Sequence, residues 1–157
     1  MKDYHAIIPA VWVIVKNDKG QIFMLRRANT GWRDGSWTVP AGHVEKDEGP
    51  IAAAIRELKE EVGLTISAEQ LSEPLVHFYP ADTYDHERVS LFFQLNDYDG
   101  TPTNTEPDKA NKAAWFDMDK LPEAMPPLLR RAFIDIKAGT NYSERYYDTH
   151  HHQELLQ

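Results

Sequence analysis

Hydrophobic positions along the chain fall into short runs separated by polar turn signals, a pattern typical of a mixed α and β domain. Residues 7–15 form a β-rich run, residues 17–20 read as a turn, and residues 21–27 resume the run. The sequence therefore predicts that the first two strands form a hairpin. A loop is predicted at 29–36, short extended pieces at 37–39 and 42–45, and later strands at 75–79 and 88–95.

Two helices are predicted from a different periodicity. Pro50 suits a first helical turn, and Gly63 suits the position just after a last one. Between them, hydrophobic residues recur at the spacing of one helix face and are expected to face a core. These residues are Ile51, Ile55, Leu58 and Val62.

The second helix is predicted at residues 128–136, after two prolines. The polar segment from residue 140 is expected to be only partly ordered. We therefore expect one domain over residues 1–140, with a sheet covered by helices, and a polar C-terminal tail over 141–157.

Composition narrows the class of protein. The chain has 157 residues and no cysteine, which excludes disulfides and thiolate metal sites and fits a cytoplasmic protein. The longest apolar stretch, residues 6–15, contains Pro9 and is too short to span a bilayer. A formal charge of −8 argues against a nucleic acid polymer as partner. The net charge neither favours nor excludes a small nucleotide as substrate, because bound cations can reverse the local field.

The first predicted helix carries an acidic face. Glu57 and Glu61 lie about 40° apart around the helix axis, and Glu60 lies about 60° to the other side of Glu57. Like charges at this spacing do not stabilise a helix. Such oxygen-rich clusters suit hard cations such as Mg²⁺ or Mn²⁺. Taken alone, the pattern is better explained as a solvated acidic face, because charged helix faces are common.

The acidic face is part of a longer motif. The pattern Gly-x5-Glu-x7-Arg-Glu-U-x-Glu-Glu-x-Gly-U, where U is aliphatic, is filled at every specified position. It resembles the box of the Nudix hydrolase family, and the predicted strand, loop and helix supply the context that the box requires. The matching residues are Gly42, Glu48, Arg56, Glu57, Leu58, Glu60, Glu61, Gly63 and Leu64.

The resemblance implies an α/β/α sandwich with a mixed sheet and a loop–helix–loop catalytic motif. It implies hydrolysis of a diphosphate linkage by water, with Mg²⁺ as cofactor and Mn²⁺ as the alternative. Glu57, Glu60 and Glu61 would bind metal, assisted by the Ala41 carbonyl. Glu57 would be the general base, with Glu60 as the rival. By the same resemblance, Arg56 would orient the glutamates, Glu48 would brace the loop, and Gly42 and Gly63 would be structural.

Outside the box, the chain is most similar to MutT-type nucleoside triphosphate pyrophosphohydrolases. Residues 22–28 resemble the strand whose second arginine contacts phosphate in that class, so Arg27 is a substrate-binding candidate, with Arg26 second. An exposed strand residue is the alternative for Arg27. Glu106 resembles an extra metal-binding or catalytic glutamate, or is an ordinary loop acid beside Pro107.

One position departs from the MutT pattern. Met125 stands where that class has an asparagine that reads the purine, and a thioether cannot donate a hydrogen bond. Met125 is therefore expected to pack in a core or against a base face, and Thr38 is the other candidate for reading the base.

Other features carry less information. Pro80 has a spacing associated with ADP-ribose hydrolysis that also occurs in the MutT class. Residues 150–152 are three histidines in the tail, interpreted as tail sequence. Several aromatic side chains suit either base stacking or, as favoured, a core. These are Trp32, Trp37, Phe78, Tyr79 and Trp115.

Three functions are weighed. The first is hydrolysis of a nucleoside triphosphate to the monophosphate and pyrophosphate. The second is hydrolysis of a diphosphate conjugate such as ADP-ribose or a nucleotide sugar. The third is a Nudix domain that senses a nucleotide without cutting it. The intact glutamates and the lack of an attached effector domain favour an enzyme.

Overall fold

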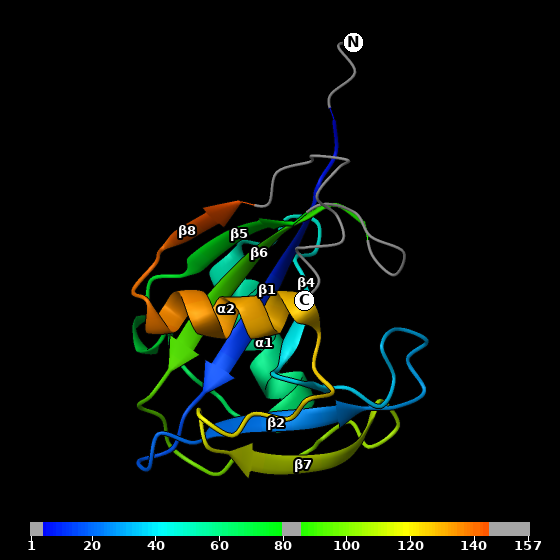
Figure 1. The fold of residues 1–157 in the computed structure, drawn as a ribbon, viewed down its shortest axis with the longest axis vertical. Coiled ribbons are helices and arrows are strands. Elements are labelled where there is room, and N and C mark those ends of the chain that lie inside the picture. The colour runs from blue at the N-terminus through cyan, green and yellow to red at the C-terminus, as the bar shows by residue number, and fades with distance from the viewer. Residues whose placement is uncertain (1–4, 80–85, 145–157) are drawn as a thin grey trace.

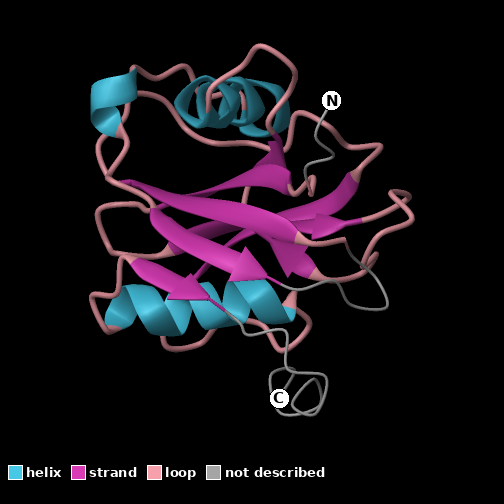
Figure 2. Cartoon of the chain, turned by 90° about the horizontal axis from the view of Figure 1, so that it is seen from above, coloured by secondary structure: helices cyan, strands magenta, loops and turns pink. Residues whose placement is uncertain are grey.

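The protein is a three-layered sandwich of helices and sheets (Figure 1). The computed structural model describes residues 5–79 and 86–144. Helices α1 (Pro50–Val62) and α2 (Pro127–Lys137) cover opposite faces of the strands (Figure 2). The predicted α/β/α sandwich is therefore confirmed. Pro80 and the histidines at 150–152 lie outside the described residues.

The larger sheet is mixed and has the order β4-β1-β6-β5-β8. β1 runs parallel to β6, and β5 runs parallel to β8, whereas the β1–β4 and β5–β6 pairs are antiparallel. The strands predicted at 75–79 and 88–95 have exactly the predicted bounds. The five strands are β1 (Ile8–Val15), β4 (Ala41–His43), β5 (Leu75–Tyr79), β6 (Arg88–Leu95) and β8 (Tyr142–Glu144).

A second, antiparallel sheet shows that the predicted hairpin is wrong. It has the order β3-β2-β7, with β2 (Ile22–Arg27) between β3 (Trp37–Thr38) and β7 (Ala110–Phe116). The turn at 17–20 forms, with the Gly20 N–H donating to the Asn17 carbonyl. Beyond it, β1 and β2 diverge into different sheets. The reason is that β1 is already paired on both sides, by β4 and β6.

The core explains why β1 reads as a continuous apolar run. Its side chains alternate, so that Val11 and Val13 pack with α1 and Trp12 and Ile14 pack with α2. Both faces of the strand are buried, which removes the polar positions that an exposed face would need. Each buried side chain of this size contributes roughly 1.5–3 kcal/mol to folding. β1 therefore joins the two hydrophobic layers.

Helix α1 follows the predicted face only in part. Leu58 and Val62 are fully buried, whereas Ile51 is 47% exposed, so its predicted place in the core is wrong. The small side chains Ala53 and Ala54 fill the core at that end of the helix instead.

The end of α1 is as predicted. Gly63 has a φ of 74°, a left-handed conformation that favours glycine. It lets the Leu64 N–H donate to the Leu58 carbonyl and returns Leu64 to the core.

Two strands and a short helix have no counterpart in the sequence analysis. β7 carries polar residues on an exposed stretch, and β8 lies in the segment interpreted as tail. The 3₁₀ turn η1 (Ala68–Gln70) follows α1. Within the described residues, none of the helices is long and apolar enough to cross a membrane.

Candidate active site

Glycine 42 brings the backbone of β4 into contact with the carboxylate of Glu57. Gly42 pairs with Val11 in the sheet, and α1 lies beside this edge. A Cβ atom at position 42 would lie 1.8 Å from Glu57 Oε1 and 2.2 Å from its Cδ. Because real carbon contacts are much longer, only glycine leaves room for the carboxylate where it lies.

A second carboxylate from the next turn of α1 reaches the same strand. The Ala41 N–H donates to Glu61 Oε2 at 2.9 Å. Burial raises the pKa of Glu61 to about 8, against the effect of this hydrogen bond, and the charges of Glu57 and Glu106 raise it further. Burial also raises the pKa of Glu57. This pair of carboxylates therefore resists ionisation in the absence of a nearby cation.

Arg56 and Glu48 fix the loop that precedes α1. Arg56 donates from Nε and Nη2 to the two oxygens of Glu48, at 2.9 and 3.0 Å. Glu48 also accepts from the Glu45 N–H at 3.0 Å, and the Arg56 hydrogen bond lowers the pKa of Glu48 to about 2. Arg56 further donates to the His43 carbonyl at 3.1 Å and to Glu57 at 2.7 Å. Arg56 therefore connects the loop at Glu48, the backbone of β4 and the carboxylate of Glu57.

The third glutamate of the helix points elsewhere. The Glu60 side chain is 52% exposed and accepts from Arg56 Nη1 at 3.3 Å. It does not line the pocket that Glu57 and Glu61 line. Glu106 also lies outside that lining, paired with Lys109 at 2.8 Å, although its charge acts on both Glu57 and Glu61. Of the three glutamates predicted to form one acidic sector, Glu57 and Glu61 therefore line the pocket and Glu60 does not.

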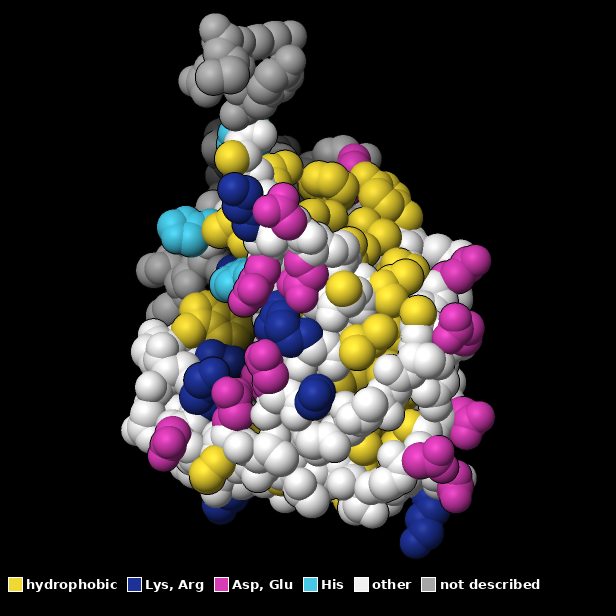
Figure 3. Space-filling model, turned by 180° about the vertical axis from the view of Figure 1, so that it is seen from behind, with side chains coloured by type: hydrophobic (Ala, Val, Ile, Leu, Met, Phe, Trp, Pro, Cys, Tyr) yellow, Lys and Arg dark blue, Asp and Glu magenta, His cyan; other side chains and the backbone are white. Residues whose placement is uncertain are grey.

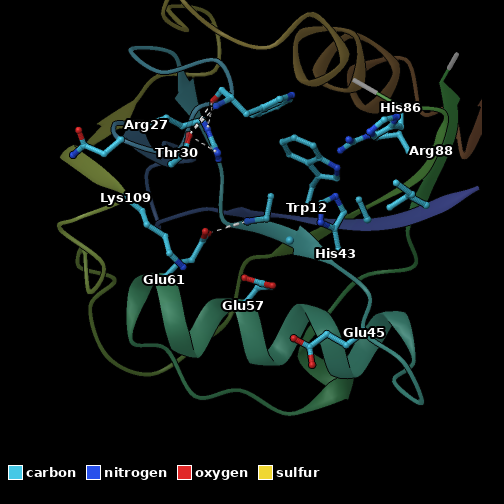
Figure 4. A pocket seen from close by; sticks show the side chains of 16 residues that line it. Trp12, Arg27, Thr30, His43, Glu45, Glu57, Glu61, His86, Arg88 and Lys109 are labelled. Atoms are coloured by element: carbon cyan, nitrogen blue, oxygen red, sulfur yellow. Dashed lines mark hydrogen bonds between the residues drawn. The ribbon is translucent and has the colours of Figure 1, made fainter. Parts of the chain in front are cut away.

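A cavity of about 830 Å³ lies over Glu57 and Glu61. Figure 3 shows a hollow with a hydrophobic floor between histidine side chains and Lys or Arg side chains. In Figure 4, Arg27, Thr30 and Lys109 lie toward one end of the pocket, and His43, His86 and Arg88 lie toward the other. The lining residues are Ile8, Ala10, Trp12, Arg27, Asn29, Thr30, Trp32, Ala41, Gly42, His43, Glu45, Glu57, Glu61, His86, Arg88 and Lys109.

Arg27 lines the pocket from the last position of β2. The register with β7 shifts between Arg26 and Arg27, where Asn111 of β7 has no partner on β2. Arg27 donates to the Trp32 carbonyl at 2.9 Å and to Thr30 Oγ1 at 3.0 Å, and its guanidinium lies 4.7 Å from the Trp32 ring centre. Burial lowers the pKa of Arg27. Arg26 instead donates to the Gly35 carbonyl and does not line the pocket.

The two residues considered for reading a base lie away from the cavity. Met125 is 7% exposed and packs in the hydrophobic cluster beneath α2. Thr38 is 4% exposed, and its hydroxyl donates to the Val39 carbonyl at 3.1 Å. Neither residue lines the pocket.

The aromatic residues divide between pocket and core. Trp32 lines the pocket, whereas Trp37 packs edge-on against Phe116 and Trp115 packs edge-on against Phe23. Trp12, which belongs to no motif in the sequence, also lines the pocket and stacks on Phe92 at a ring-centre distance of 5.6 Å.

The basic residues at the second end were also missed. His43 lies inside the box at an unspecified position, and Arg88 opens a strand. No local pattern marks either residue. Burial, together with the charge of Arg88, lowers the pKa of His43.

The donor set fits a hard divalent cation. Glu57 and Glu61 offer carboxylate oxygens, and Mg²⁺ is typically held by one or two carboxylates together with substrate phosphates. Across residues 5–79 and 86–144, no three His, Asp or Glu side chains are arranged to hold one ion together. A cation at this pair would therefore complete its ligands from substrate, water or backbone oxygens.

Comparison with known proteins identifies the family of this chain and several of its relatives. A family model described as the NUDIX domain matches residues 6–135. The 8-oxo-dGTP diphosphatase of Escherichia coli (strain K12) is 29% identical over 120 residues, which cover 75% of this chain and 90% of that protein. The RNA pyrophosphohydrolase of Hahella chejuensis (strain KCTC 2396) is 41% identical over 71 residues, 45% of this chain and 42% of that protein. This second match spans less than half of either chain.

Solved structures agree in fold. The MutT NUDIX hydrolase from Burkholderia pseudomallei superposes with a TM-score of 0.75 at 23% identity, over 84% of this chain and 99% of that one. The MutT protein from Methanosarcina mazei Go1 superposes with a TM-score of 0.71 at 20% identity, over 88% of this chain and 98% of that one.

Proposed function

This chain belongs to the Nudix family, and from that premise we propose that it hydrolyses a nucleoside triphosphate to the monophosphate and pyrophosphate with a divalent cation, Mg²⁺ or Mn²⁺. The sequence-based assignment to Nudix-type pyrophosphohydrolases is confirmed at the level of the family. The observation that carries the proposal is the close contact of Glu57 with Gly42, beside Glu61 in the cavity.

The chemistry is the addition of water across a P–O–P linkage. Water attacks one of the two phosphorus atoms, the P–O bond from that phosphorus to the bridging oxygen breaks, and the other phosphate group leaves with the bridging oxygen. A cation held by Glu57 and Glu61 would supply positive charge against the diphosphate oxygens and would make water more acidic. Arg27 and Lys109 border the cavity beside Glu61 and are placed to donate hydrogen bonds to phosphate oxygens.

The side chain that removes the proton is proposed to be Glu57. It lines the cavity and accepts a hydrogen bond from Arg56, which holds its carboxylate where a water molecule in the cavity can reach it. Glu60, the rival named from sequence, is exposed on the outer side of the helix. Glu61 is proposed as a metal ligand with Glu57, because its position is fixed by the Ala41 N–H.

A substrate panel tests the proposed function. ATP, ADP-ribose, a nucleotide sugar and a 5′-triphosphorylated RNA oligonucleotide are incubated with Mg²⁺ or Mn²⁺, and released monophosphate and pyrophosphate are measured. The RNA is included because one relative is named as an RNA pyrophosphohydrolase. We expect turnover of ATP that stops in excess EDTA. Undiminished turnover in EDTA would exclude the metal mechanism, and exclusive turnover of a conjugate or RNA would replace the substrate class.

A broad base preference is a second expected result. Met125 and Thr38 lie in the core, so neither supplies a polar contact to a base in the cavity. Apolar and aromatic contacts discriminate by only about 1–3 kcal/mol. We therefore expect kcat/KM for 8-oxo-dGTP, dGTP, dATP and dCTP to agree within about a hundredfold under one metal condition.

8-oxo-dGTP is included among these substrates because one relative is named as an 8-oxo-dGTP diphosphatase. If kcat/KM for 8-oxo-dGTP exceeds the others by more than about a thousandfold, a buried polar group must read the base. Asn29, the amide that lines the cavity, would then be the residue to replace.

A further inference from the structure

The end of the cavity beyond Glu57 is built by three strands of the larger sheet. β4 and β6 flank β1, with His43 opposite Ala10 and Arg88 opposite Ile8. Paired residues on neighbouring strands point to the same face of a sheet. These four side chains therefore emerge together on the face that Trp12 shares, since positions 8, 10 and 12 alternate with the buried valines of β1.

This end is rich in hydrogen-bond donors, among them the charged guanidinium of Arg88. Arg88 is only 7% exposed yet lines the cavity, and His43 and His86 border it from more exposed positions. Glu45 and Glu57 are the carboxylates that line the cavity nearest to these residues in Figure 4. A buried guanidinium at a cavity wall is well suited to a phosphate, which it can bind with two parallel hydrogen bonds.

The opposite end also presents cations. Arg27 and Lys109 lie there, so positive charge stands on both sides of the Glu57–Glu61 pair (Figure 4). A linkage cleaved over this pair therefore extends toward cations in both directions. A diphosphate conjugate has only the two phosphates of the cleaved linkage itself, so it brings no further phosphate to the second end of the cavity.

We propose that His43, His86 and Arg88 form an anion subsite for the phosphate distal to the cleaved linkage. The subsite selects substrates with three or more phosphates over diphosphate conjugates whose distal group is a neutral sugar. The inference rests on the proposed function for its substrate, and on the register of three strands for its geometry.

The test compares two substrates in matched variants. kcat/KM is measured for ATP and for ADP-ribose in the wild type, R88Q, R88K and H43Q. Hydrogen bonds to charged groups are worth about 1.5–3 kcal/mol, so R88Q should lower the ratio of the two values about tenfold or more, mainly through KM for ATP. R88K should recover part of the ratio. K112Q removes a positive charge from an exposed position on β7 and should leave the ratio as in the wild type.

A binding measurement separates this inference from the proposed function. Inorganic pyrophosphate is titrated into each protein in the presence of Mg²⁺ and followed by calorimetry. R88Q and H43Q should weaken its affinity about tenfold or more, whether or not ATP is turned over. A wild type that binds pyrophosphate through Arg88 but does not cleave ATP would retain the subsite and refute the proposed function.

Two results would overturn the subsite. One is an equal loss for ATP and ADP-ribose in R88Q, and the other is unchanged pyrophosphate affinity in R88Q. Arg88 is buried at the start of β6, so thermal melting is recorded for each variant. If R88Q does not fold, H43Q and H86Q alter exposed side chains and decide the same question by the same two measurements.

Discussion

Glu57→Gln and Glu61→Gln should each lower kcat about a hundredfold or more while the protein remains folded. Each substitution keeps the shape of the side chain and removes its charge, so the site loses a metal ligand or the proton acceptor. E61Q should melt close to the wild type, because the buried Glu61 carboxyl already resists ionisation and the amide keeps an oxygen that can accept from the Ala41 N–H. E57Q should melt slightly lower, because Arg56 loses a charged partner. The measurements are kcat with ATP at saturating Mg²⁺, and the melting temperature.

A matched substitution at an exposed glutamate controls for the loss of charge alone. Glu73 lies before β5 and outside the cavity, so Glu73→Gln should retain wild-type kcat. If E57Q or E61Q kept near-wild-type kcat with a normal metal dependence, the role assigned to that residue would be wrong.

Gly42→Ala should cost activity on a similar scale by a different route. The new Cβ would lie 1.8 Å from Glu57 Oε1, so the carboxylate must leave its place against β4. A displacement of this size removes the group from the position where a proton acceptor acts, and we expect kcat to fall about a hundredfold or more. The control is Gly49→Ala, because Gly49 has nothing within 4 Å of a new Cβ and an ordinary φ of −92°.

The double variant G42A/E57Q identifies the route. If the new methyl group acts through Glu57, it has little left to disturb once the carboxylate is an amide, and the double variant should be about as slow as E57Q alone. Losses that multiply would instead show that Gly42 acts on the sheet or on Glu61, and the steric explanation would fail.

The sequence predicted those features that depend on neighbours in the chain. The turn at residues 17–20, the end of α1 at Gly63 and the bounds of β5 and β6 follow from local spacing and from backbone preferences. The hairpin prediction failed because strand pairing is not local. The edges of β1 are taken by β4 and β6, which come from later parts of the chain, and no pattern within residues 7–27 contains that information.

The same limit applies to the candidate site. The box and the helix angles both grouped Glu60 with Glu57 and Glu61. In the structure, Glu57 and Glu61 line the cavity beside β4 and Glu60 does not, because β4 lies beside only one side of α1. Arg88 and His43 are brought together by their pairing with opposite edges of β1. Their position at the cavity depends on strand pairing, so neither sequence segment predicts it alone.

The position of β1 also links stability to activity. Its side chains enter both hydrophobic layers, and its outer residues Ile8 and Ala10 form part of the cavity wall. Loosening either layer would therefore disturb the wall of the cavity. On heating, activity and folded structure should therefore be lost in a single cooperative transition. We expect no intermediate in which one hydrophobic layer has opened and the active site remains.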